Sequence, residues 1–328
     1  MKRKQHDTFA RSAMKLLCFF LAVVLVFLLG ATALFQQVLG KIHYTQPTAD
    51  LGSRLNVLLS DLRSNSTRKS EDLIGGTGSG IVNILLIGQD RREGENISRS
   101  DSMILCTYHR KTGNLTMTSF LRDLYVPIPG HSSNRINAAY SEGGMELLDE
   151  TLKQNFGLHI DGNIEVDFSQ FSGIIDLLGG VRIELREDEA EVINQETGSS
   201  LSAGVQTLSG MEALTYARIR KLDLDGDFSR TNRQRKVINA LLDSYRDLKW
   251  RDLLPLMEQL LPMISTDLNY GQLVLLAMEI LPKLHNAQIT NQRIPADGTY
   301  TDEKIDGMAV LSADLDANRA LLRETLLN

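Results

Sequence analysis

The chain has 328 residues, 42% of them hydrophobic, and a formal net charge of −6, so it has the length for more than one domain and a globular composition. Five of its 35 basic residues and one of its 41 acidic residues precede residue 16, which leaves a net charge of about −10 on the rest. This acidic balance argues against nucleic acid as a partner. Its two cysteines, Cys18 and Cys106, lie in separate apolar runs and are not expected to pair, which argues against a disulfide scaffold.

A long apolar run near the N-terminus predicts a membrane anchor at residues 16–38. Between Leu16 and Phe35 the run is almost purely apolar, and roughly 20 apolar residues are enough to cross the hydrocarbon core. The basic residues of segment 1–15 predict a cytoplasmic tail, and hence an extracellular position for everything after the anchor. The alternative is a cleaved signal peptide, because Ala31-Thr32-Ala33 resembles a cleavage site. Both interpretations export the rest of the chain.

Residues 39–80 are expected to form a juxtamembrane segment and linker, since residues 63–80 are rich in serine, glycine and charge. Beyond them, apolar runs of strand length alternate with segments of helical periodicity. Strands are expected at 81–87, 102–108, 115–121, 164–168 and 181–185, and helices at 145–156, 168–178, 209–216, 233–248, 253–263, 272–284 and 315–327. We therefore predict an α/β catalytic domain over 81–248 and a mostly helical extension over 249–328 that packs on its core.

Arginine and aspartate recur at the ends of the apolar runs. Asp90 and Arg92 follow the first expected strand, and the pair Arg122-Asp123 follows the third, at carboxyl ends where α/β sheets keep ligand sites. For any one of these residues a loop salt bridge or a helix cap is the simpler interpretation. Arg99 with Asp101, and the segment from Arg218 to Gln234, bring these occurrences to four in one domain. Together they favour a shared anionic ligand, because long charged side chains are rarely buried unpaired.

Two of the aspartates are candidates for a metal site. Asp90 and Asp101 are separated by a loop that could fold their carboxylates toward each other. Two hard oxygen ligands beside phosphate oxygens suit Mg²⁺, which takes few protein ligands and keeps several waters. The alternative is that each carboxylate pairs with a nearby arginine.

The second half of the expected domain adds a cluster of arginines. In Arg218-x-Arg220 a period of two puts both side chains on one side of an extended segment, and Arg230 and Arg233 are one helical turn apart. Guanidinium groups bind phosphate oxygens bidentately and stay protonated, so several of them together favour a diphosphate over a carboxylate. The alternative is a solvated helix entrance, which is less favourable because arginine there opposes the helix dipole.

These motifs, in this order, resemble the LytR-CpsA-Psr family of cell-wall glycopolymer ligases. The resemblance covers roughly Ile81 to Leu248 and is carried by Gly88-x-Asp90-x-Arg92, Arg99-Ser-Asp101-Ser, Leu121-Arg122-Asp123, Pro127-Ile-Pro129-Gly130, Arg135-Ile-Asn137-Ala-Ala-Tyr140 with Gly143-Gly144, Leu178-Gly-Gly-Val181, and Ala213-Leu-x-Tyr216-x-Arg218-x-Arg220 through Gly226-Asp227 to Arg230-x-x-Arg233-Gln234. Two positions depart from the family pattern: Arg135 stands where lysine is more frequent, and Leu121 where proline is usual.

The resemblance implies a three-layer α/β/α domain around a mixed central β-sheet. It also implies transfer of a glycopolymer, such as teichoic acid or capsular polysaccharide, from a polyprenyl diphosphate carrier to a peptidoglycan acceptor. Asp90 and Asp101 would hold Mg²⁺. The diphosphate would be bound by Arg92, Arg99, Arg122, Arg135, Arg218, Arg220, Arg230, Arg233 and Gln234.

Arg122, Asp123, Arg218 and Asp227 are the residues expected to act in catalysis, with Asp123 or Asp227 as candidate base for the acceptor hydroxyl. An apolar slot for the polyprenyl chain is expected between the sheet and helices, near Phe168–Leu178 and Val237–Leu248, where the same residues could be ordinary core. Two other functions remain open. One is a polyprenyl diphosphatase with water as acceptor, and the other is a lipid-diphosphate-binding envelope regulator without catalysis.

Overall fold

The structure, a computed structural model, describes residues 73–76, 79–89, 100–220, 222, 226–244 and 250–327, without the side chains of 226, 227, 250–254 and 281. The predicted anchor, most of the predicted linker and the candidate residues Asp90, Arg92 and Arg99 lie outside the described residues. Among the described helices, none has the length and apolar character needed to cross a membrane.

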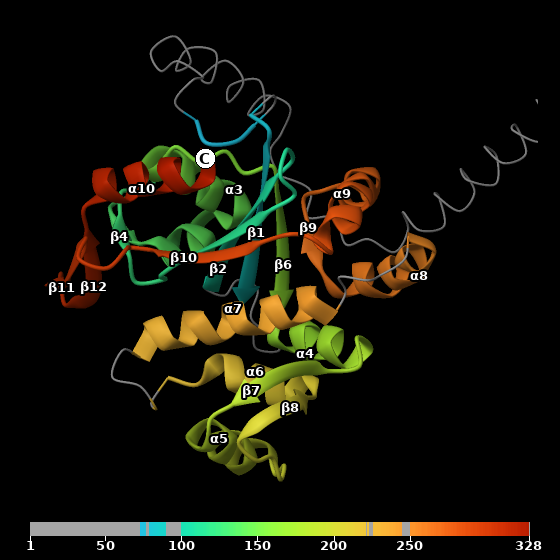
Figure 1. Cartoon of the computed structure of the whole chain (residues 1–328). Helices are drawn as coiled ribbons and strands as arrows, with labels where there is room; N and C mark the ends of the chain where they lie inside the picture. Colours follow the sequence, from blue (N-terminus) through green and yellow to red (C-terminus); the bar gives the residue numbers. More distant parts are fainter. Residues whose placement is uncertain are drawn as a thin grey trace, which may run out of the picture. The chain divides into compact units, whose positions relative to one another are not determined.

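A six-stranded mixed sheet forms the centre of the fold (Figure 1). Its order is β10 (Ile289–Ile294), β3 (Leu115–Phe120), β2 (Ser100–His109), β1 (Ile81–Gln89), β6 (Gly162–Asp167) and β9 (Ser265–Thr266). β1 is parallel to β6, and β3 is parallel to β10, while β2 runs antiparallel between β1 and β3. Four strands therefore end at the edge of the sheet where β2 begins.

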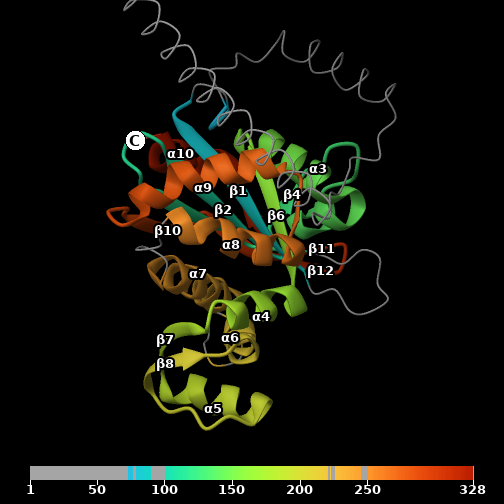
Figure 2. The same ribbon diagram turned by 90° about the vertical axis from the view of Figure 1, so that its right-hand side faces the viewer.

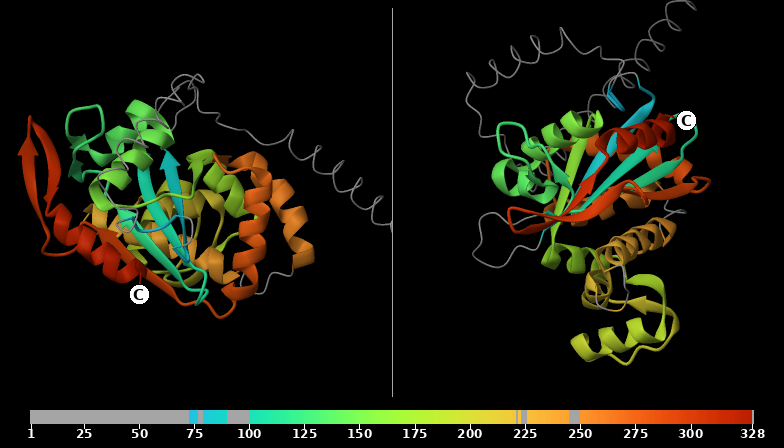
Figure 3. Two further views of the ribbon diagram at one scale, coloured as in Figure 1. Left: turned by 90° about the horizontal axis from the view of Figure 1, so that it is seen from above. Right: turned by 90° about the vertical axis from the view of Figure 1, so that its left-hand side faces the viewer.

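Helices cover both faces of this sheet, which confirms the α/β/α prediction. On one face, α3 (Ile136–Phe156) and α10 (Leu315–Leu327) share a core with inward-facing residues of β1 such as Leu85 and Ile87. On the other, α7 (Gly226–Ser244) and α9 (Tyr270–Leu284) pack against Val82 and Tyr108, with α8 (Trp250–Leu260) beside α9 (Figure 2). Seen from above, green α3 and orange α8 and α9 flank the sheet (Figure 3, left).

The segment that follows β6 builds a smaller layer beyond α7. It contains α4 (Phe168–Leu177), β7 (Val181–Leu185), α5 (Glu187–Thr197), β8 (Gly204–Leu208) and α6 (Gly210–Arg218), with β7 and β8 paired antiparallel. Figures 1 and 2 show α7 between this layer and the central sheet. The predicted capping box opens α6, because Glu212 accepts a hydrogen bond from the Ser209 backbone N–H. The close approach of α6 to α4 requires Gly210, whose added Cβ would lie 2.0 Å from the Ser172 carbonyl oxygen.

Two helices start earlier than their periodicity predicted. α3 begins at Ile136 and not Met145, and its backbone is non-helical at Gly143 and Gly144, so the break hid its first turns. α7 begins at Gly226 and not Arg233, which places Arg230 and Arg233 in its second turn rather than its first. The polar start of α7 lacks the apolar spacing on which the prediction rested.

The C-terminal segment differs most from its prediction. Its three expected helices are present, and α10 and α9 pack on the two faces of the sheet. It also supplies strands β9 and β10 to the central sheet, together with the 3₁₀ turn Leu261–Met263 and the hairpin β11 (Tyr300–Ile305) and β12 (Met308–Ala313). A second small hairpin pairs β4 (Tyr125–Val126) with β5 (Asn134–Arg135). The expected division at residue 248 thus separates strands of one sheet, because β10 pairs along the whole of β3.

Candidate functional site

A cavity of about 630 Å³ opens at the edge where β1 and β3 end and β2 begins. Six of the residues predicted for the site line it, namely Asp101, Arg122, Arg218, Arg220, Arg230 and Gln234. They come from β2, from the turn after β3, from the end of α6 and from α7. Only the folded sheet and α7 bring these distant segments together.

Arg122 is held by carboxylates on two sides. Its Nη1 lies 2.8 Å from Oδ1 of Asp101, and its Nε lies 3.4 Å from Oδ2 of Asp123. All three side chains are at least three-quarters buried, where an ion pair is less screened than at the surface. Arg122 is therefore anchored at the mouth of the cavity by residues that the sequence assigned to metal binding and catalysis.

Arg135 extends this chain of charges but does not line the cavity. Its Nε lies 3.3 Å from Oδ1 of Asp123, and its Nε and Nη2 also donate to the Ala309 carbonyl oxygen, at 2.9 and 2.6 Å. The prediction that Arg135 contacts the diphosphate is thus not matched by its position. Arg135 instead ties Asp123 to the hairpin β11–β12.

Arg218 and Arg220 both line the cavity, but Arg218 is the last residue of α6 and not part of the extended segment that the spacing predicted. Both side chains are exposed, while Ile219 between them is buried and extended, with φ −57° and ψ 127°. The Arg218 guanidinium stacks on the Phe168 ring, 4.5 Å from its centroid. Stacking restricts the side chain and leaves its N–H groups free to bind an anion in the plane of the guanidinium.

Arg230 and Gln234 project from α7 into the same cavity, one turn apart. Arg230 is 2% exposed, and Gln234 accepts a hydrogen bond from the Ser102 hydroxyl at 3.0 Å. The latter bond fixes α7 to β2. A nearly buried guanidinium at the wall of a polar cavity is suited to a ligand with negative charge.

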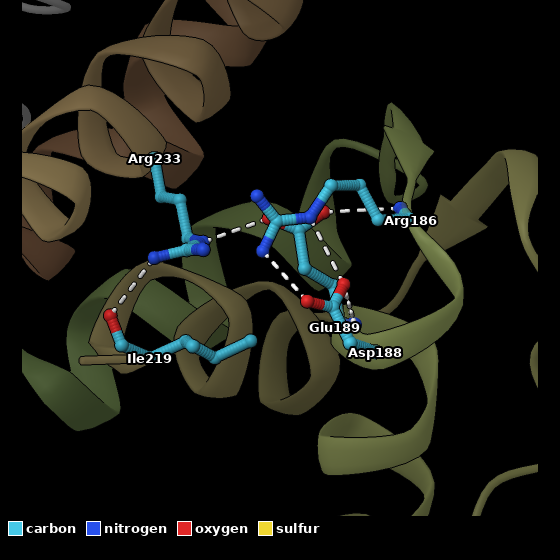
Figure 4. Close-up of polar contacts among 5 residues, drawn as sticks. All are labelled: Arg186, Asp188, Glu189, Ile219 and Arg233. Carbon is cyan, nitrogen blue, oxygen red and sulfur yellow. Dashed lines mark hydrogen bonds and ion pairs between the residues drawn. The ribbon is translucent and has the colours of Figure 1, made fainter. Parts of the chain in front are cut away.

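Arg233, like Arg135, is a predicted ligand that does not line the cavity. It is buried, its Nε lies 2.9 Å from Oε1 of Glu189, and its Nη1 donates to the Ile219 carbonyl oxygen at 3.2 Å (Figure 4). The carboxylate of Glu189 also accepts the backbone N–H of Arg186 at the start of α5. The guanidinium of Arg233 is thus paired with a buried carboxylate on α5 and not directed into the cavity. Through its hydrogen bond to the Ile219 carbonyl oxygen, Arg233 holds the backbone between Arg218 and Arg220 in place.

Two features of the site were not predicted. Phe168 follows β6 directly and supplies the ring under Arg218, and its place after a strand was the available signal. Gly88 lines the cavity, where an added Cβ would lie 3.1 Å from that of Ser102. Asp227 starts α7, but its side chain is outside the described residues, so its role stays a prediction.

Asp101 supplies a carboxylate at the cavity, the kind of oxygen donor that a hard cation takes. Ser102, the next residue, also lines the cavity, and Asp90 follows β1 directly in the sequence. Within the described part of the chain, no three acidic, histidine or cysteine side chains gather as metal ligands. The residues fit an ion that takes few protein ligands and completes its shell with water and phosphate oxygens, as Mg²⁺ does.

A mixed α/β/α domain with several guanidinium groups in one cavity at a strand-end edge defines a protein that binds a phosphate-rich ligand. Residues 58–325 match the LytR_cpsA_psr family, and the chain belongs to this family. The chain is 30% identical over 270 residues to the polyisoprenyl-teichoic acid–peptidoglycan teichoic acid transferase TagU of Bacillus licheniformis. The aligned segment covers 80% of this chain and 83% of that protein.

Other similar proteins match over a shorter segment. TagT of Bacillus subtilis is 35% identical over 52% of this chain and 55% of its own length, and the regulatory protein MsrR of Staphylococcus aureus is 39% identical over 49% and 48%. Among solved structures, TagT bound to LIIa-WTA has a TM-score of 0.63 at 27% identity, covering 80% of this chain and 97% of that one. TagT with bound octaprenyl pyrophosphate lipid has a TM-score of 0.59 at 25% identity, covering 78% and 95%.

Proposed function

We propose that this chain is a membrane-anchored, extracytoplasmic phosphotransferase. It transfers a glycopolymer from a polyprenyl diphosphate carrier to peptidoglycan and releases polyprenyl phosphate. The observation that carries the proposal is the convergence of Arg122, Arg218, Arg220 and Arg230 on one cavity that contains a carboxylate, Asp101. The names of TagU and TagT and the lipid bound in a TagT structure support the same chemistry.

In this reaction the arginines position the diphosphate and neutralise its charge. The acceptor hydroxyl oxygen attacks the sugar-linked phosphorus, the phosphoanhydride bond breaks, and the leaving polyprenyl phosphate takes the bonding electrons. Phosphoryl transfer is catalysed mainly by positioning and charge neutralisation, so fixed guanidinium groups are a sufficient set of catalytic groups. Arg122 and Arg218, held by Asp101 and Phe168, are oriented before the substrate arrives.

Asp123 is better suited to orient Arg122 than to accept the acceptor's proton. One of its oxygens faces Arg122 and the other faces Arg135. Both oxygens are thus directed at guanidinium groups, and Asp123 does not line the cavity. This leaves Asp227 as the remaining candidate base.

Asp90 and Asp101 would hold Mg²⁺, which when bound would offset negative charge on the diphosphate oxygens. The position of Asp101 at the cavity and its hard oxygen donors support this assignment. The same carboxylate also holds Arg122. Loss of Asp101 would therefore affect both the cation and the guanidinium.

A row of partly exposed apolar side chains leads away from the cavity and suits the polyprenyl chain. On β1, Leu85 and Ile87 are fully buried toward α3, whereas Ile84 and Leu86 on the α7 side are only half-buried. This second row ends at Gly88, which lines the cavity. Half-buried apolar side chains of the facing helices include Leu242, Leu276 and Ile280.

Product analysis tests the proposal against its rivals. Purified full-length chain, Mg²⁺, a polyprenyl-diphosphate-linked glycopolymer and uncrosslinked peptidoglycan should give polymer joined to peptidoglycan through a phosphodiester, together with polyprenyl phosphate. Free sugar phosphate formed equally well with and without acceptor would indicate a diphosphatase. Tight donor binding without any product would indicate a regulator.

The location of the domain can be tested separately. A reporter enzyme that is active only outside the cytoplasm, fused at Asn328, should be active. A reporter that is active only in the cytoplasm should be silent, and activity of that reporter would contradict the proposed topology.

A further inference from the structure

A second pair of arginines lies on the same side of the sheet as the cavity, one strand further along. Arg235 on α7 donates from Nη1 to the Ser119 hydroxyl of β3 at 2.7 Å and to the Gln292 carbonyl oxygen of β10 at 3.3 Å. Arg293, the next residue of β10, is opposite Ser119 in the sheet register. Neither residue lines the cavity or takes part in the site already described.

The positive charges of Arg235 and Arg293 are only partly neutralised by nearby carboxylates. Arg235 is 7% exposed, and burial, followed by the charge of Arg293, lowers its pKa to about 10. Among the described contacts, the Nε atoms of both arginines are buried without a hydrogen-bond partner. Among the described residues, Arg293 is paired with the carboxylate of Asp297, whose side chain is 83% exposed and so well hydrated. Two adjacent cations with spare donors are favourable when an anion lies between them.

The arrangement repeats that of the first site. There, α7 contributes a buried arginine, Arg230, and Arg218 stacks on Phe168. Here, α7 contributes the buried Arg235, and Arg293 stacks on Phe228, 4.3 Å from its centroid. Phe228 and Arg235 are two turns apart on one face of α7, which holds both groups over β3 and β10.

We propose that Arg235 and Arg293 form a second anion-binding site that takes a phosphate of the glycopolymer itself, beyond the diphosphate link. This rests on the proposed function. Ser119 precedes Arg122 by three residues, so the two sites are within about 10 Å at the strand rise. A chain whose repeating units carry phosphodiesters can bridge them. The site thus selects an anionic glycopolymer over a neutral one.

The test compares two synthetic donors that share one polyprenyl diphosphate and one disaccharide. One carries a short poly(glycerol phosphate) chain and the other carries a neutral oligosaccharide of similar length. Equilibrium binding to the detergent-solubilised full-length chain is measured by titration calorimetry for wild type, Arg293→Gln, Arg293→Lys and the control Arg182→Gln, an exposed arginine of β7.

Wild type should bind the phosphate-bearing donor at least about tenfold more tightly than the neutral one. Arg293→Gln should remove this preference and leave the neutral donor within about twofold, whereas Arg293→Lys should keep part of the preference and Arg182→Gln all of it. An unchanged preference in Arg293→Gln, or an equal loss for both donors, would overturn the inference. Because binding is measured, a chain that keeps the preference without transferring either donor contradicts only the proposed function.

Discussion

Arg122 and Asp101 form an ion pair between the end of one strand and the start of its neighbour, with Nη1 2.8 Å from Oδ1. Each comes from a motif predicted to do a different task, diphosphate binding for Arg122 and metal binding for Asp101. Their contact joins the two tasks in one network at the cavity, which Asp123 and Arg135 continue behind Arg122.

Replacing Asp101 by Asn should therefore have two effects. Transfer should fall by about 10² or more, because Arg122 loses a charged partner and the cation loses a ligand. The Mg²⁺ concentration for half-maximal activity should also rise at least about tenfold. Rates measured against Mg²⁺ after EDTA treatment test this, with Asp123→Asn as the matched control. An Asp101→Asn enzyme with the wild-type Mg²⁺ dependence would show that Asp101 only positions Arg122.

Arg218→Ala should lower transfer by about 10² to 10³, the typical effect of removing one preorganised charge-stabilising donor. The free energy of unfolding should change little, because the Arg218 side chain is exposed at the end of α6. Turnover and urea unfolding of the purified variant are compared with those of Arg182→Ala, which lies on the exposed face of β7. Wild-type turnover in Arg218→Ala would show that Arg218 does not contribute to transfer.

Arg233→Met should behave in the opposite way. It leaves the buried carboxylate of Glu189 without its 2.9 Å partner, which typically costs about 3 to 5 kcal/mol. The double variant Arg233→Met/Glu189→Leu should recover part of this loss, since no buried charge is then left unpaired. The measurement is the denaturant midpoint of wild type, of Arg233→Met and of the double variant. A single variant as stable as wild type would mean that Arg233 is not a structural residue.

A pH-dependent contribution to stability should come from Asp149, away from the cavity. Burial raises its pKa to about 7, with Asp267 and Glu146 adding to the shift and a hydrogen bond from Asn163 opposing it. Between about pH 4 and 7 the folded chain holds a proton that the unfolded chain has lost, so this group's contribution to stability falls as pH rises through that window. Asp149→Asn should remove this fall.

The measurement is the difference in unfolding free energy between wild type and Asp149→Asn at pH 4.5 and pH 8. We expect the unfolding free energy of Asp149→Asn to rise relative to that of wild type toward pH 8, where wild type carries the buried charge. Parallel curves across this range would contradict the assignment. Carboxylates distant from Asp149 that titrate in the same range cancel in the difference.

Local patterns in the sequence were sufficient for much of the fold. The buried strands β1, β2 and β3 and the capping box of α6 were predicted close to their observed bounds, because apolar period and capping are local signals. Strand β10 was missed, since its Thr-Asn-Gln-Arg centre lies at a half-exposed position beside β3 and shows no apolar run. Its pairing is a tertiary contact that no local pattern encodes.

The same distinction between local patterns and tertiary contacts applies to the site. Arg122, Arg218 and Arg230 were predicted from their positions at the ends of elements, and the structure brings them to one cavity. Arg233 was assigned with them because it lies one turn from Arg230. Its direction depends on Glu189, which is distant in sequence, so only the folded chain shows that it belongs to the support and not to the cavity.

The most direct test of the central claim is a crystal or cryo-EM structure of the full-length chain with a polyprenyl-diphosphate-linked sugar. The account predicts density for the two phosphates in the cavity, within hydrogen-bond distance of the guanidinium groups of Arg122, Arg218 and Arg230, and the polyprenyl chain along Ile84 and Leu86. Phosphate density elsewhere on the chain, with this cavity holding only water, would contradict it.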